Sequence, residues 1–180
     1  MRAVLDACVL YPSVMRDLLL GAAARGLYEP RWSDRILEEW ARATVKLGPA
    51  AEAVARADIA QMRLHFPSAF ALPATGVEAR LILPDPDDVH VLATAITTHA
   101  DAIVTTNAKD FPRHLLAEEG ISRRDPDGFL WELWSHHPDQ MGAVVAKVHA
   151  TAERMAGGPL SLTALLKRAR LNRLAKAVTA

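Results

Sequence analysis

Residues 83–111, LPDPDDVHVLATAITTHADAIVTTNAKDF, contain the stretch that decides the fold. The stretch opens with an acidic turn and continues as an apolar helical pattern. A short β-like run follows at 102–105, and a polar turn then ends at Asp110. Carboxylates therefore lie at the start of a helix and just beyond the carboxyl end of a strand. In an α/β fold these two places face the same crevice, so we expect other polar side chains to converge there.

The N-terminal segment predicts a central parallel strand. The strand begins at Arg2, and its apolar residues surround Asp6. Apolar residues on both faces are typical of a strand buried in a parallel sheet. Asp6 would lie at or near the carboxyl end, where a buried carboxylate requires a partner, a proton or a metal ion. A turn or helix-cap aspartate explains Asp6 equally well when it is considered alone.

Helical and extended patterns alternate along the rest of the chain. A short extended segment is expected at 27–32, and an alternating pattern predicts a strand at 77–82. The predicted helices span 14–25, 34–46, 50–66, 129–155 with an interruption near Pro138, and 160–178. This order predicts a three-layer α/β/α domain with a central parallel sheet. We expect this domain at 1–128 and a helical C-terminal extension at 129–180.

Composition and charge limit the possible classes of protein. The 180-residue chain carries 21 basic and 21 acidic side chains, so its net charge indicates no polyanionic partner. The distribution is uneven, because 129–180 holds 7 basic and 3 acidic residues, which hints at contact with nucleic acid. The single Cys8 excludes an internal disulfide. With neither a signal peptide nor a membrane span predicted, we expect a cytoplasmic protein without a membrane partner.

Several acidic residues occupy strand ends or helix starts. Unpaired carboxylates in one crevice repel one another and raise one another's pKa, and a hard divalent cation relieves this repulsion. Oxygen ligands favour Mg²⁺ or Mn²⁺, which can polarise a phosphate and generate hydroxide for phosphodiester hydrolysis. The candidates are Asp6, Glu39 or Glu38, Asp88 and Asp110.

Each of these acids also has a purely structural explanation. Asp85 as an N-cap with Pro86 at the first helical position would leave the two following aspartates to complement the helix dipole. Glu38 and Glu39 are both compatible with a solvated helix face. Whether Glu38, Asp85 and Asp87 take part in a site stays open at this point.

Four segments occur in the order seen in PIN-domain ribonucleases: VLDACVLYP, WSDRILEEW, DPDDVHVLATA and VTTNAKDFP. Over 2–125 the chain resembles this family, and in particular the VapC-type toxins of type II toxin–antitoxin systems. The resemblance implies an acidic quartet that binds Mg²⁺ or Mn²⁺ and activates water to cut RNA. Its members would be Asp6, Glu39, Asp88 and Asp110. Glu39 is preferred to Glu38 because the family's acid directly precedes a hydrophobic residue, here Trp40.

Residues around the quartet both follow and depart from the family pattern. Thr105 and Asn107 resemble the polar helpers near the fourth acid. Many PIN domains have Asn two residues after the first Asp, where this chain has Cys8, so an amide that could orient the metal shell is missing. We interpret Cys8 as a small buried residue and His90 as a structural or solvent-facing residue.

The resemblance implies a metal-dependent endoribonuclease that is the toxin of a toxin–antitoxin pair. The implied partners are an RNA substrate, a cognate antitoxin that covers the active-site groove and a second copy of the chain in a homodimer. The alternative is a PIN-fold module that binds RNA or protein without cutting. A phosphatase acting on small esters is a third interpretation, and the lack of a DxD sequence at the first strand disfavours it.

The C-terminal extension has two features of its own. Phe129, Trp131 and Trp134 fit either a packing stripe that joins the extension to the body or a surface for a partner. A solvated helix face is the simpler explanation of the basic residues near the C-terminus, and phosphate contact with RNA is the functional one. These residues are Lys167, Arg168, Arg170, Arg173 and Lys176.

Overall fold

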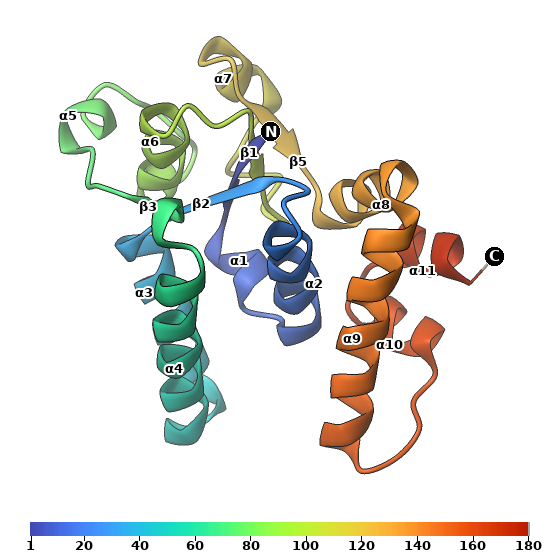
Figure 1. The fold of residues 1–180 in the computed structure, drawn as a ribbon. Helices are drawn as coiled ribbons and strands as arrows, with labels where there is room; N and C mark the ends of the chain where they lie inside the picture. Colours follow the sequence, from blue (N-terminus) through green and yellow to red (C-terminus); the bar gives the residue numbers. More distant parts are fainter. Residues whose placement is uncertain (180) are drawn as a thin grey trace. The chain divides into compact units, whose positions relative to one another are not determined.

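The computed structural model describes residues 1–179, which form two compact units. Unit 1 comprises Met1–Tyr11 and Tyr28–Arg124, and unit 2 comprises Pro12–Leu27 and the chain from Asp125 onward. Figure 1 shows the elements of both units in sequence colours. Unit 2 therefore combines an early segment of the chain with the C-terminal helices. The domain division predicted at residue 128 stays a prediction.

Unit 1 contains a five-stranded parallel sheet with the strand order β3-β2-β1-β4-β5. The strands are β1 (Arg2–Leu5), β2 (Glu29–Ser33), β3 (Phe70–Ala71), β4 (Ala102–Val104) and β5 (Ser122–Arg124). The central strand β1 buries Ala3, Val4 and Leu5 completely, as expected for a strand covered on both faces. The predicted α/β class with a central parallel sheet and C-terminal helices is confirmed.

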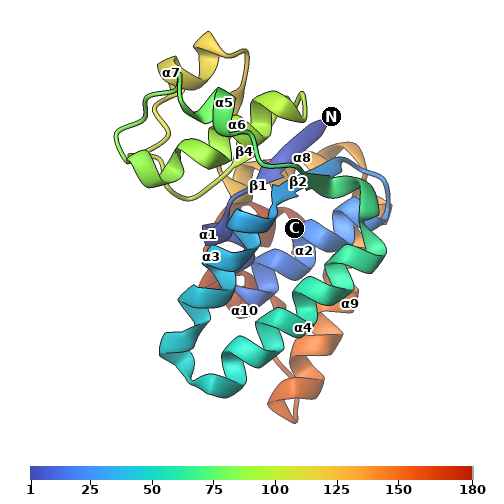
Figure 2. The same ribbon diagram turned by 90° about the vertical axis from the view of Figure 1, so that its left-hand side faces the viewer.

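Helices connect these strands within unit 1. They are α1 (Ala7–Leu10), α3 (Asp34–Thr44), α4 (Pro49–His65), α5 (Thr75–Glu78), α6 (Val89–Thr97) and α7 (Arg113–Glu118), with 3₁₀ turns η1 (Val45–Leu47), η2 (Pro67–Ala69) and η3 (Pro86–Asp88). Ser33 caps α3 by accepting a hydrogen bond from the Ile36 backbone, as its sequence position predicts. Figure 2 shows α3 and α4 side by side. An ion pair between Asp34 and Arg63 at 2.7 Å links these two helices.

Aromatic residues anchor the edge of the sheet in unit 1. The fully buried Trp32 on β2 makes edge-on contacts with Phe66 and Phe70, with ring centroids 5.7 and 5.8 Å apart. Pairs of this kind contribute about 0.5–1.5 kcal/mol beyond the burial of their area. Helix α6 packs on β1, β2 and β4 and buries the continuous run from His90 to Ala95. This packing fixes the start of α6 relative to the strand ends.

The predicted and observed strands differ in two places. The predicted strand at 77–82 is wrong, because Thr75–Glu78 forms the short helix α5 and the edge strand lies earlier, at Phe70–Ala71. The alternating pattern has no buried face to define a strand, since Ile82 is 83% exposed. Strand β5 was not predicted, because its sequence, Ser-Arg-Arg, has no apolar periodicity.

Unit 2 consists of helices. They are α2 (Ser13–Ala24), α8 (Pro126–His136), α9 (Pro138–Ala156), α10 (Leu162–Arg168) and α11 (Asn172–Val178). The predicted interruption near Pro138 is confirmed. The single final helix predicted at 160–178 is wrong, because the chain turns at Arg170, whose φ of +61° is left-handed. The Asp127 carboxylate accepts the backbone N–H groups of Arg173 and Leu174, at 2.8 and 3.0 Å, and so caps the separate helix α11.

A close helix contact organises the core of unit 2. Gly21 on α2 faces Val144 on α9 so closely that a Cβ atom at Gly21 would lie 2.6 Å from a valine methyl group. The absence of a side chain therefore allows these two helices to approach. Among residues 1–179, no helix is both long enough and sufficiently apolar to cross a membrane.

Candidate metal centre

The pairing of β1 with β4 places Asp6 beside Thr105. Leu5 is in register with Val104, and the Asp6 backbone N–H donates to the Val104 carbonyl at 3.2 Å. The next residues therefore lie side by side at the carboxyl ends of the strands, where the Thr105 hydroxyl donates to Oδ2 of Asp6 at 2.7 Å. Both side chains are buried. This hydrogen bond compensates part of the cost of removing the carboxylate from water.

Cys8 is a second neighbour of the Asp6 carboxylate. Its Sγ lies 3.1 Å from Oδ2 of Asp6 and accepts the Thr106 backbone N–H at 3.3 Å. Burial, reinforced by the charge of Asp6, raises the pKa of the Cys8 thiol to about 11. The thiol is therefore protonated at neutral pH and donates to the carboxylate. Cys8 is half-buried and makes hydrogen bonds to Asp6 and Thr106, whereas the sequence led us to expect a small buried residue that only packs.

The acidic turn before α6 divides its carboxylates between two roles. Asp85 accepts the Asp87 backbone N–H at 2.9 Å and is the N-cap of η3, as the structural explanation predicted. Within the described chain, the Asp88 carboxylate makes no capping hydrogen bond to α6. It accepts a hydrogen bond from the Asn107 side-chain amide at 3.0 Å instead. Asp88 is therefore directed toward the loop after β4.

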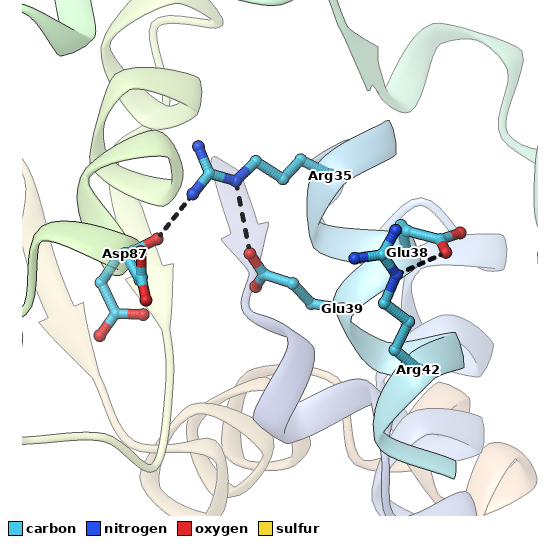
Figure 3. Close-up of a pocket in the computed structure, with 6 residues that line it drawn as sticks. Arg35, Glu38, Glu39, Arg42 and Asp87 are labelled. Atoms are coloured by element: carbon cyan, nitrogen blue, oxygen red, sulfur yellow. Dashed lines mark hydrogen bonds and ion pairs between the residues drawn. The ribbon is translucent and has the colours of Figure 1, made fainter. Parts of the chain in front are cut away.

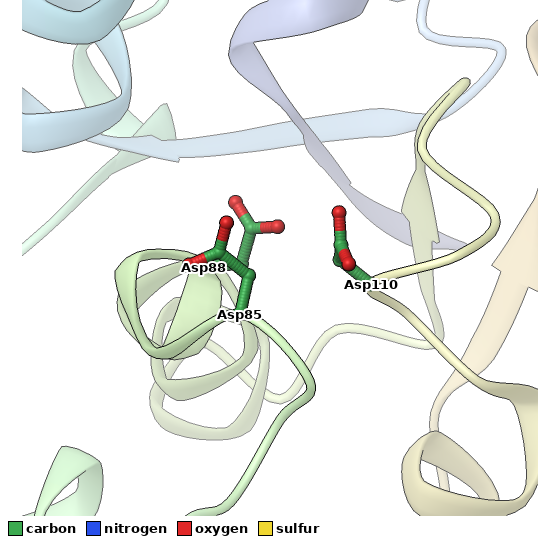
Figure 4. A group of neighbouring side chains, drawn as sticks. All are labelled: Asp85, Asp88 and Asp110. Atoms are coloured by element: carbon green, nitrogen blue, oxygen red, sulfur yellow. The ribbon is translucent and has the colours of Figure 1, made fainter.

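Three carboxylates, from the acidic turn before α6 and from the loop after β4, come together. Asp85, Asp88 and Asp110 each offer an oxygen atom, and these atoms lie within 4.8 Å of one another. Figure 4 shows Asp110 facing the other two side chains. Asn107 connects the loops, because its amide binds Asp88 while its Oδ1 accepts the Asp110 backbone N–H at 3.4 Å. This group includes Asp85, whose part in a site the sequence left open beside its role as a cap.

The electrostatics of Asp88 connect this group to the other predicted acids. Burial, followed by the charges of four neighbouring carboxylates, raises the pKa of Asp88 to about 6. These neighbours are Asp6, Asp85, Asp110 and Glu39. Asp6, Glu39 and Asp110 thus each lie within electrostatic reach of Asp88. Closely spaced oxygen donors with unrelieved like-charge repulsion fit a hard divalent cation.

Glu39 reaches this region from α3. Its Oε1 lies 2.7 Å from Nε2 of His90 and 3.6 Å from Nε of Arg35. The histidine separation is short, yet neither nitrogen of this buried ring has a hydrogen-bond partner among the described residues. Glu39 and His90 are therefore close neighbours without a hydrogen bond between them. His90 is buried, whereas a solvent-facing position was one of the two expectations.

A cavity of about 460 Å³ opens between α3 and the acidic turn. Figure 3 shows its lining residues, which are Arg35, Glu38, Glu39, Arg42, Asp87 and Asp88. Both predicted acids of this part of the site, Glu39 and Asp88, therefore border one cavity together with two arginines.

Glu38 has different partners from Glu39. Its carboxylate accepts hydrogen bonds from Arg56 on α4, at 3.0 Å, and from Arg42 at 2.9 Å. The Arg56 guanidinium, followed by that of Arg42, lowers the pKa of Glu38 to about 2. The structure thus places Glu38 in an ion-pair network with α4, while Glu39 approaches the buried His90. The choice of Glu39 over Glu38 as a metal ligand stays a prediction.

Comparison with known proteins gives one match. A family model described as PIN domain matches residues 2–109, which is more than half of the chain. The chain belongs to the PIN-domain family. No curated protein and no solved structure showed significant similarity to it. PIN domains are typically metal-dependent nucleases, and the matched residues include Asp6, Glu39 and Asp88, with Asp110 following directly.

One further residue positions the acidic loop of this PIN domain. Arg123 on β5 donates through Nη1 to the carbonyls of Ala108 and Phe111, at 2.7 and 2.9 Å. These carbonyls flank Asp110, so the guanidinium holds both sides of the turn that carries the acid. No pattern in the sequence pointed to Arg123, because β5 itself was not predicted. Asp85 had a weak signal, since it lies three residues before Asp88 in one helical turn.

Proposed function

We propose that this PIN-domain protein is a divalent-metal-dependent endoribonuclease. The observation that carries the proposal is the convergence of carboxylates on Asp88. Three carboxylates offer oxygens within 4.8 Å, and Asp6 and Glu39 also raise the Asp88 pKa. The proposed site residues are Asp6, Glu39, Asp88 and Asp110, with Asp85 as an additional ligand. An acidic crevice of this kind would repel RNA unless a cation occupied it.

The side chains around the acids have separate tasks in this proposal. Asp85, Asp88 and Asp110 would hold Mg²⁺ or Mn²⁺ through carboxylate oxygens. When bound, such an ion polarises a phosphate and lowers the pKa of a water molecule. Thr105 and Cys8 both bind Oδ2 of Asp6, which leaves Oδ1 as the oxygen available to the site.

Arg35 is the group best placed to contact the RNA phosphate. It lines the cavity shared by Glu39 and Asp88. Its contacts are long, at 3.6 Å to Glu39, 3.6 Å to Glu78 and 3.4 Å to the Asp87 carbonyl. The guanidinium can therefore turn toward a phosphate without breaking a strong ion pair. Arg42 in the same cavity is held more tightly, by Glu38 at 2.9 Å.

The biological setting forms part of the same proposal. The four sequence segments resemble VapC-type toxins, which supports a cytoplasmic toxin whose cognate antitoxin covers the active-site groove. A homodimer is also proposed from this resemblance. A neighbouring small gene that encodes a DNA-binding protein would support the pairing with an antitoxin.

Cleavage of labelled RNA in the presence of Mg²⁺ or Mn²⁺ tests the catalytic proposal. We expect wild-type protein to cut RNA and EDTA to abolish cutting. Asp88→Asn and Asp6→Asn should each reduce the rate by at least about a hundredfold, because each removes a negative charge that attracts the metal ion. Asp139→Asn is the control, since this exposed carboxylate lies in the first turn of α9 in unit 2, outside both the cavity lining and the three-carboxylate group.

A different result would favour the alternative, a PIN-fold module that binds RNA without cutting it. Folded wild-type protein that binds RNA and leaves it uncut with both metals would be a binding module. Equal cleavage by wild type and Asp88→Asn would show that the acids have no part in the reaction.

A further inference from the structure

Unit 2 contains a second candidate binding surface, formed by α8 and α11. A cavity of about 500 Å³ is lined by Trp131, Arg173, Lys176 and Ala177, and we call this the Trp131 surface. Trp131 is 41% exposed, while Trp32 and Trp40 are buried in unit 1. A large exposed ring within a cavity indicates a contact site, because an indole buries well when a partner is present.

The two charged residues that line the cavity, Arg173 and Lys176, are both positive. The Arg173 guanidinium lies 6.0 Å from the centre of the Trp131 ring, at the outer limit of a cation–π contact, so it is loosely held. The nearby Asp127 carboxylate is occupied by two backbone N–H groups at the start of α11. After Glu153 the chain contains no acidic residue. The basic residues of that segment are Arg154, Lys167, Arg168, Arg170, Arg173 and Lys176.

We propose that the Trp131 surface binds single-stranded RNA. The indole ring stacks on a base, and Arg173 and Lys176 contact the phosphates on either side. Surfaces that bind single strands combine aromatic stacking with positive charge, and they tolerate many sequences because every base has a flat face. The choice of RNA over other polyanions rests on the proposed nuclease function. The surface would hold substrate independently of the acids that cut it.

Binding measured without cleavage isolates this surface. Fluorescence anisotropy of a labelled oligouridylate, titrated with full-length protein in EDTA, reports affinity while the metal is absent. Trp131→Ala should weaken binding about tenfold, in keeping with the loss of one stacked base. Trp131→Phe should retain most of the affinity, because a phenyl ring still stacks. Trp134→Phe is a matched aromatic control, since the half-buried Trp134 does not line the cavity.

The salt dependence of RNA binding tests the contribution of the positive charges of this surface. Lys176→Gln should reduce the slope of log affinity against log salt by about 0.7, the value for one released counterion on a single strand. Lys147→Gln removes an exposed basic residue of α9 outside the surface and should leave the slope unchanged. RNA should also quench tryptophan fluorescence in wild type, and this quenching should be much smaller in Trp131→Phe.

These outcomes separate the two proposals. Asp88→Asn should lose cleavage and keep its RNA affinity in EDTA. If Trp131-dependent binding occurs but wild type never cuts RNA, the nuclease proposal fails and the Trp131 surface stands. If Trp131→Ala and Lys176→Gln bind the oligouridylate as wild type does, the inference is overturned, and a protein partner becomes the better occupant. Circular dichroism confirms that each variant folds.

Discussion

The Asp88 carboxylate has a raised pKa in the folded protein. Its folded-state pKa of about 6 exceeds the ordinary value of 3.8. The folded protein therefore binds this proton more tightly than the unfolded chain does. The resulting stabilisation is complete below about pH 4 and is lost as the pH rises through about 6. At neutral pH without metal, the charged Asp88 opposes folding.

A variant without this charge should show the effect. In EDTA at about pH 7.5, Asp88→Asn should raise the free energy of unfolding by about 1 kcal/mol, after allowance for solvent screening of a partly exposed group. At about pH 4 the difference should disappear. Urea denaturation at both pH values measures it, and a less stable Asp88→Asn at pH 7.5 would contradict the electrostatic interpretation.

Thr105 offers a second test at the residue scale. Thr105→Val removes the hydroxyl that binds Asp6 at 2.7 Å and keeps the shape of the side chain. We expect RNA cleavage to fall about tenfold through kcat, because Asp6 loses a hydrogen bond to a charged group. Thr105→Ser should restore the rate. Thr98→Val, which removes a hydroxyl bonded within α6, is the control and should cleave normally.

The site depends on elements that the sequence predicted unequally. The buried strand at the N-terminus and the cap-then-proline start of η3, which leads into α6, were predicted, because burial and capping leave strong local patterns. Those patterns located Asp6 and Asp88. The edge strands β3 and β5 were missed or misplaced, because two or three residues held by backbone pairing show no periodicity.

The same limit explains which contacts of the site went unnoticed. Arg123 binds loop carbonyls through a strand that left no pattern in the sequence. The hydrogen bond from Asn107 to Asp88 joins residues 19 positions apart. Only the register of β1 against β4, and the packing of α6 on both strands, bring these groups together. Capping signals alone could not reveal that Asp85 has both a cap role and a place beside Asp110.

Arg123 provides the prediction at the scale of elements. Arg123→Ala should loosen the turn that carries Asp110 and weaken Mn²⁺ binding about tenfold, since two hydrogen bonds to the carbonyls of this turn are lost. Isothermal titration calorimetry measures the affinity. Arg113→Ala removes an exposed arginine from α7 and should bind Mn²⁺ as wild type does. Unchanged affinity in Arg123→Ala would show that the turn holds its shape without the guanidinium.

The whole molecule consists of two compact units with separate tasks in our proposals. Unit 1 carries the carboxylates, and unit 2 carries the Trp131 surface. The helical core of unit 2 should therefore be open to change without loss of the metal site. Gly21 is a suitable position at which to test this, because an added Cβ would lie 2.6 Å from a methyl group of Val144.

Substitution at this contact should destabilise unit 2 selectively. Gly21→Ala should lower the free energy of unfolding by about 1–2 kcal/mol, because the stiff valine must move and this cost exceeds the gain in helix propensity. Gly142→Ala in α9, where an added Cβ meets nothing within 4 Å, should be neutral or stabilising. Thermal denaturation compares the two variants. Loss of Mn²⁺ binding in a folded Gly21→Ala protein would contradict the separation of tasks.

The central claim is that carboxylates from two loops of unit 1 form one metal site. Anomalous diffraction from crystals soaked in Mn²⁺ tests it most directly. We predict a peak within coordination distance of Asp85, Asp88 and Asp110, and no such peak in Asp88→Asn crystals. A wild-type crystal that shows no Mn²⁺ at these carboxylates, while the same protein cleaves RNA with Mn²⁺, would contradict the claim.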